Sequence, residues 1–77
     1  MPTILRIGNF RFFFYSGDNK EPAHIHVEQD DMIAKFWLDP IRLQEMGGFS
    51  RREIVKIQNI IQENQRFLLE AWHDYFS

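Results

Sequence analysis

Short runs rich in β-branched and aromatic residues fill the first half of the chain, and apolar residues at three-to-four spacing fill the second half. Four runs predict strands: residues 3–7, 10–15, 23–28 and 32–38. Gly8-Asn9 supplies the positive φ values of a tight turn between the first two, and Asp30-Asp31 joins the last two. The pattern therefore predicts two hairpins in a four-stranded antiparallel sheet, and residues 41–46 are left unassigned.

A single long helix is expected over residues 51–75. Ser50 and Glu53 form a capping-box pattern at its start. At about 1.5 Å per residue this helix is about 37 Å long, whereas a six-residue strand spans about 20 Å. Either the helix breaks within the polar residues 62–65, or its end docks on another chain. We expect the second, and therefore a homo-oligomer formed through the distal helix.

The order of elements predicts an α+β fold, with the sheet packed on the C-terminal helix in a single domain over residues 1–77. The two faces of the sheet are unlike. The first turn places Arg6 opposite Arg11 and Ile4 opposite Phe13, and the second pairs His26 with Lys35 and His24 with Trp37. We expect the helix-free face to carry Arg6, Arg11, Phe13, Tyr15, His24, His26, Glu28, Lys35 and Trp37.

Composition narrows the functional classes. The 77 residues include no cysteine and carry a formal net charge of −2, which excludes disulfide scaffolds, thiol catalysis and an overall basic nucleic-acid footprint. No secretion signal or membrane-spanning run is evident, so we expect a cytoplasmic protein with no membrane association.

The polar face supports three interpretations. In the first, Arg6 and Arg11 clamp an anion, while Phe13, Tyr15 and Trp37 anchor a partner. In the second, His24 and His26 act as acid and base in metal-free RNA cleavage, with Lys35 stabilising the transition state. In the third, His24, His26 and Glu28 hold a metal ion for hydrolysis. The leading interpretation is the first, which requires no cofactor, and whether the protein is an enzyme stays open.

Several motifs resemble those of the DUF4160 family of small bacterial proteins. They are residues 1–7 (MPTILRI), 11–16 (RFFFYS), 21–27 (EPAHIHV), 34–40 (AKFWLDP), 48–50 (GFS) and 70–72 (EAW). Ala23 stands where many members have a second proline. The resemblance implies a short cytoplasmic bacterial protein whose gene often lies beside that of another small protein, an arrangement similar to toxin–antitoxin pairs. It implies no established activity. We therefore expect a binding module with a small operon-encoded protein partner, or with RNA or DNA phosphate.

Overall fold

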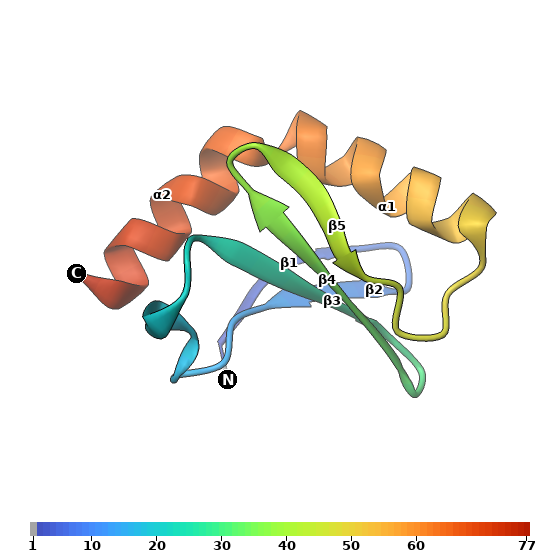
Figure 1. The fold of residues 1–77 in the computed structure, drawn as a ribbon, viewed down its shortest axis with the longest axis horizontal. Coiled ribbons are helices and arrows are strands. Elements are labelled where there is room, and N and C mark those ends of the chain that lie inside the picture. Colours follow the sequence, from blue (N-terminus) through green and yellow to red (C-terminus); the bar gives the residue numbers. More distant parts are fainter. Residues whose placement is uncertain (1) are drawn as a thin grey trace.

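The computed structural model describes residues 2–77 and shows an antiparallel sheet with two helices along one face (Figure 1). The elements are β1 (Thr3–Ile7), β2 (Phe10–Phe13), the 3₁₀ turn η1 (Asp18–Lys20), β3 (His24–Gln29), β4 (Met32–Leu38), β5 (Ile41–Glu45), α1 (Arg51–Glu63) and α2 (Gln65–Phe76). The strands lie in the order β1-β2-β3-β4-β5, so β1 and β5 form the two edges. This confirms the α+β class.

The first hairpin turns at Gly8-Asn9 as predicted, with Arg6 opposite Arg11. Gly8 adopts the expected positive φ, 58°, whereas Asn9 does not. The pairing of Ile4 with Phe13 was wrong, because an irregularity in β1 shifts the register and places Thr3 opposite Phe13. Such a bulge places two residues of one strand opposite one residue of its partner, so the pairs beyond the bulge are shifted by one position.

The second hairpin confirms the expected register. Asp30 takes a left-handed φ of 55°, a conformation that Asp tolerates better than most residues. His26 therefore pairs with Lys35, and His24 with Trp37. A two-residue turn thus fixes which side chains of β3 and β4 share a face.

The sheet has five strands, so the prediction of four was wrong. β5 follows a turn at Asp39-Pro40 and pairs with β4, with Ile41 opposite Leu38 and Arg42 opposite Trp37. Most of its residues are exposed. An edge strand receives little apolar burial from its neighbours, which is why its hydrophobic pattern is weak.

The capping box at the start of α1 is confirmed. The Ser50 N–H donates to Glu53 Oε1 at 3.0 Å, and the Glu53 N–H donates to Ser50 Oγ at 3.2 Å. Two N–H groups that the first helical turn leaves without partners are satisfied in this way.

The single long helix was also wrong, because the chain bends at Asn64 between α1 and α2. The side-chain amide of Asn64 donates to the Ile60 carbonyl at 2.8 Å, and that of Gln65 donates to the Leu38 carbonyl at 2.7 Å. The Asn64 side chain thus satisfies a helix carbonyl where the helix is interrupted, and the Gln65 side chain links the bend to the end of β4. Trp72 is consequently buried within its own chain, whereas Tyr75 of the same helix stays 43% exposed. A homo-oligomer formed through the distal helix stays a prediction.

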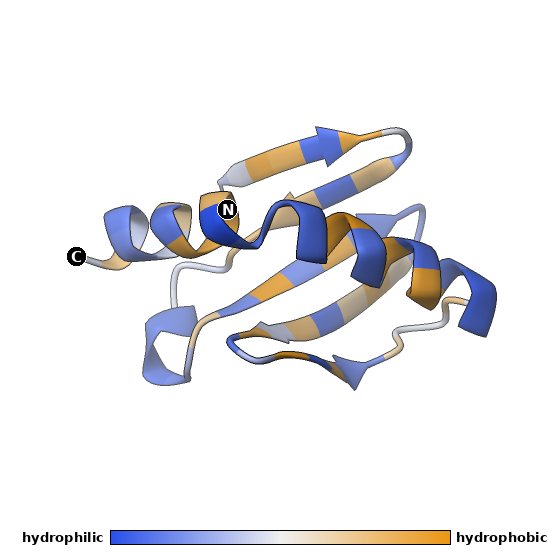
Figure 2. Ribbon diagram, turned by 90° about the horizontal axis from the view of Figure 1, so that it is seen from above, coloured by the Kyte–Doolittle hydropathy of each residue, from blue (hydrophilic) through white to orange (hydrophobic). Residues whose placement is uncertain are grey.

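The core lies between the helices and one face of the sheet. Hydrophobic and hydrophilic residues alternate along α1 (Figure 2), and its buried residues Ile54, Ile57 and Ile61 belong to the core. The largest fully buried side chains of this core are Phe12, Phe14, Phe36, Ile25, Leu38, Ile57, Ile61, Leu68 and Val27, whereas Phe13 is buried on the opposite face of the sheet. In residues 2–77, neither helix is both long and apolar enough to cross a membrane.

The stability that Glu53 contributes should depend on pH. Its hydrogen bonds with Ser50 hold the pKa of the Glu53 carboxyl below its ordinary value of 4.5. Because the folded pKa is depressed, this contribution is present above pH 4.5 and is lost as the pH falls through the folded value. We expect Glu53→Gln to lower the thermal unfolding midpoint at pH 7 and to leave it nearly unchanged near pH 3. An equal difference at both pH values would contradict this account.

A close backbone approach predicts a large difference between two glycines. Gly8 and Gly47 both have positive φ, but a Cβ on Gly8 would meet open space, whereas one on Gly47 would lie 1.7 Å from the Ile33 carbonyl oxygen. Gly8→Ala should cost about 1–2 kcal/mol of unfolding free energy from backbone strain. Gly47→Ala should cost about 1–3 kcal/mol more than Gly8→Ala, because the backbone near Ile33 must also shift to make room for the new Cβ. Urea unfolding of the two variants measures the difference.

Candidate functional site

The charged residues on the helix-free face are largely paired with one another. Arg11 Nε lies 2.9 Å from Glu28 Oε1, and Lys35 Nζ lies 2.6 Å from Glu21 Oε1. Arg6, opposite Arg11, is exposed. The structure therefore places the two arginines side by side as predicted, but the Arg11 guanidinium already has a carboxylate partner.

The aromatic residues of this face form a layer around Phe13. The His26 ring stacks on Phe13 at 5.5 Å between centroids, Tyr15 contacts its edge at 5.1 Å, and the Arg11 guanidinium lies over it at 4.2 Å. Phe13 is only 1% exposed, so it cannot act as the surface anchor we predicted. Tyr15, at 36% exposed, is the accessible member of the layer.

Trp37 is half-buried, with the Lys35 ammonium 4.8 Å from its ring centroid. Together with Arg42 and Pro40 it lines a hollow of about 210 Å³. This is the second aromatic side chain of the face that a partner can reach.

His24 is not on the open surface. It is fully buried, with its ring 5.0 Å from Trp72 of α2 and 5.7 Å from Trp37. The bend at Asn64 is the physical reason, because it brings the end of α2 onto the start of β3. The His24 Nδ1–H donates to the Pro22 carbonyl at 2.8 Å, which fixes the ring. The prediction that both imidazoles project openly with the two arginines was therefore wrong for His24.

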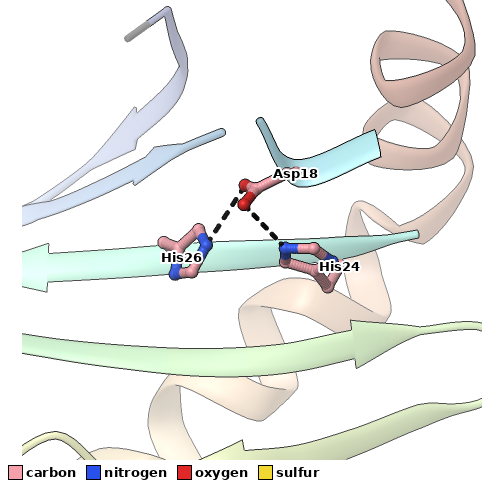
Figure 3. Close-up of side chains that lie close together, drawn as sticks. All are labelled: Asp18, His24 and His26. Atoms are coloured by element: carbon pink, nitrogen blue, oxygen red, sulfur yellow. Dashed lines mark ion pairs between the residues drawn. The ribbon is translucent and has the colours of Figure 1, made fainter. Parts of the chain in front are cut away.

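Asp18 of η1 joins His24 and His26 in a compact cluster (Figure 3). Asp18 Oδ1 lies 3.2 Å from His24 Nε2, and Asp18 Oδ2 lies 3.2 Å from His26 Nε2. The Tyr15 N–H donates to Asp18 Oδ2 at 2.8 Å and holds the carboxylate in place. Neither imidazole Nε2 has a hydrogen-bond partner among residues 2–77. Two buried nitrogens thus face one carboxylate without a hydrogen bond.

The pKa values of His26 in the cluster and of the neighbouring Glu21 are both shifted. Burial lowers the pKa of His26 below its ordinary 6.5, although the Asp18 carboxylate opposes this shift. The hydrogen bond from Lys35 lowers the pKa of the exposed Glu21 below 4.5. The two shifts favour the neutral form of the His26 imidazole and the ionised form of the Glu21 carboxyl.

The carboxylate that faces both imidazoles is Asp18, whereas the sequence suggested Glu28. Glu28 lies two residues beyond His26 on the same strand, but its side chain pairs with Arg11. Residues 16–22 lie between two predicted strands, and the sequence pattern assigned them no role. The available signal was a carboxylate six residues before His24, in a short loop whose end is constrained by Pro22.

The burial of His24 argues against its predicted role as an acid or base in RNA cleavage. A general acid or base must come within hydrogen-bonding reach of the substrate. His24 has no solvent-accessible surface, and its Nδ1 is engaged by the Pro22 carbonyl. The structure therefore gives no support to a mechanism in which His24 and His26 divide the acid and base roles while Lys35 stabilises the transition state.

A shallow hollow of about 410 Å³ opens on the helix-free face beside the cluster. It is lined by Tyr15, His26, Ile33, Lys35, Gln44 and Glu45. Its walls therefore combine an exposed aromatic ring, an aliphatic side chain and charges of both signs.

Comparison with models of protein families matches residues 9–73 to the family described as Domain of unknown function (DUF4160). Comparisons with curated proteins and with solved structures give no match. The family match covers the strands that carry the cluster and most of both helices.

The two arginines should have opposite effects on stability. Arg11→Gln removes the ion pair with Glu28 and the hydrogen bond to Thr3 Oγ1, so we expect it to cost about 0.5–1.5 kcal/mol. Arg6→Gln removes a like charge directly opposite Arg11, and we expect no loss, or a gain of up to about 0.5 kcal/mol. Urea unfolding at low salt measures both. Equal losses in the two variants would contradict the assignment.

Proposed function

The chain belongs to the DUF4160 family, and we propose that it is a small cytoplasmic bacterial binding module that engages an operon-encoded protein through its helix-free sheet face. It acts as one component of a pair of the toxin–antitoxin kind. The genomic part of this proposal follows from the family resemblance. The choice of surface follows from the side chains of the face.

The observation that carries the proposal is the hollow lined by Tyr15, His26, Ile33, Lys35, Gln44 and Glu45. Tyr15 presents a large ring that is already held by contacts with Phe13 and His26, so little side-chain entropy remains to be lost on binding. Rigid, partly exposed aromatic residues in a concave setting are typical of binding hot spots. Trp37 and Arg42, around the neighbouring hollow, extend the same surface.

Charge favours a protein over a nucleic acid as the partner. Binding to a phosphate backbone depends on cations that replace condensed counterions. Arg11 and Lys35 are each engaged by a carboxylate, and Glu45 adds a negative charge at the rim. A face with paired charges of both signs fits the mixed polar rim of a protein interface.

The test uses the protein encoded beside this one in its genome, with both partners purified and affinity measured by isothermal titration calorimetry. Tyr15→Ala should weaken binding by about 30-fold, the cost of a typical hot-spot residue. Tyr75→Ala is the matched control, because Tyr75 is similarly exposed but lies on α2. Its affinity should equal that of the wild type.

Two results would overturn the proposal. One is equal weakening by Tyr15→Ala and Tyr75→Ala, which would place the interface elsewhere. The other is the absence of binding to the neighbouring protein together with salt-dependent binding of single-stranded RNA, measured by fluorescence anisotropy. That result would assign the face to nucleic acid.

A further inference from the structure

We propose that Asp18, His24 and His26 form a binding site for a divalent transition-metal ion of the zinc class. The three side chains offer one carboxylate oxygen and two imidazole nitrogens, and these ligand atoms all lie within 4.8 Å of one another. The site shares His26 with the partner-binding surface proposed above, but the argument for it does not depend on that function.

The protonation of His24 supplies the first argument. A carbonyl oxygen can only accept, so the contact with Pro22 requires the proton of His24 on Nδ1. In the neutral ring, Nε2 then carries a lone pair, and this lone pair faces the Asp18 carboxylate at 3.2 Å. Two lone pairs repel at this distance. A cation between them replaces the repulsion with two coordinate bonds.

The unpartnered nitrogens supply the second, independent argument. His24 Nε2 and His26 Nε2 are both buried, and neither makes a hydrogen bond within residues 2–77. Leaving buried polar atoms without partners is costly, and native proteins rarely do so. Asp18 lies beside both nitrogens, and Glu21 Oε1 lies 3.9 Å from His24 Nε2 but is already engaged by Lys35. One metal ion would satisfy both nitrogens and the Asp18 carboxylate together.

The distances and the donor set indicate which ion fits. In a tetrahedral site with bonds of about 2.0–2.1 Å, neighbouring ligand atoms lie about 3.3 Å apart. His24 Nε2 lies 3.2 Å from Asp18 Oδ1, and His26 Nε2 lies 3.2 Å from Asp18 Oδ2. A carboxylate that binds the ion through one oxygen would therefore have to rotate to bring that oxygen toward both imidazoles. Two imidazoles and a carboxylate suit Zn²⁺ and its neighbours, whereas Mg²⁺ and Ca²⁺ prefer oxygen ligands alone.

The surroundings resemble those of known metal-binding histidines. Ligating histidines usually donate their second ring N–H to a carbonyl or carboxylate, which fixes the ring and its tautomer. His24 makes such a bond to Pro22, and Asp18 is held by the Tyr15 N–H. Three protein ligands leave a fourth position for water or another small ligand. A bound ion would therefore fasten η1 to β3 beside the hollow that includes His26.

The experiment measures Zn²⁺ binding to tag-free, EDTA-treated full-length protein by isothermal titration calorimetry. We expect one Zn²⁺ per chain and a thermal unfolding midpoint that rises with Zn²⁺ concentration. Replacing Zn²⁺ with Co²⁺ should give the visible absorption of a four-coordinate site. Asp18→Asn and His26→Ala should each weaken binding by more than the roughly 10–100-fold cost of losing an outer-shell partner.

Controls keep the test independent of folding. Asp18→Asn retains an oxygen that can accept from the Tyr15 N–H, so this variant should keep its far-UV circular dichroism without metal. His73→Ala removes the remaining histidine, an exposed residue of α2, and should bind Zn²⁺ as the wild type does. The absence of stoichiometric binding to the wild type would overturn the proposal. Binding that survives in the folded Asp18→Asn variant would overturn it equally.

Discussion

The bend at Asn64 is the constraint on which the rest of the molecule depends. The amide of Gln65 anchors it to the carbonyl of Leu38, so the final segment turns onto the sheet instead of running past it. Trp72 can then pack against Phe14 and His24. Without this bend, the start of β3 would lie open and Trp72 would be exposed. Two side-chain amides therefore determine whether a histidine of the sheet is a surface group or a buried one.

Burial of His24 changes the chemistry of the whole face. An exposed imidazole exchanges protons with water and can serve as an acid or a base. Trp72 and the η1 loop enclose the His24 ring and hold it in one orientation. Its Nδ1 donates to the Pro22 carbonyl, and its Nε2 is directed at Asp18. The neighbouring cations Arg11 and Lys35 are also neutralised within the chain, because each forms an ion pair with a carboxylate. The buried His24 is therefore not placed to exchange protons with a substrate at this surface.

Local patterns predicted the parts of the fold that depend on nearest neighbours. The turns at Gly8 and Asp30, the pairing of His26 with Lys35 and the capping box at Ser50 all follow from short-range rules. The bend depends on the contact between Gln65 and Leu38, which are 27 residues apart. The role of Asp18 depends on a loop folding back over β3. The periodicity of hydrophobic residues carries no information on such long-range contacts. The sequence therefore predicted which side chains of β3 and β4 share a face, but not the burial of His24 or the position of Asp18 beside it.

The two edges of the sheet carry a consequence for how the molecule avoids self-association. An edge strand offers main-chain donors and acceptors to any extended segment that aligns with it. In β5, exposed Arg42, Gln44 and Glu45 make such pairing costly, because a second copy in antiparallel alignment would have to desolvate these polar side chains. At the opposite edge, the irregularity near Thr3 breaks the flat hydrogen-bonding template of β1. Both edge strands thereby discourage the edge-to-edge pairing of copies that would build a fibril.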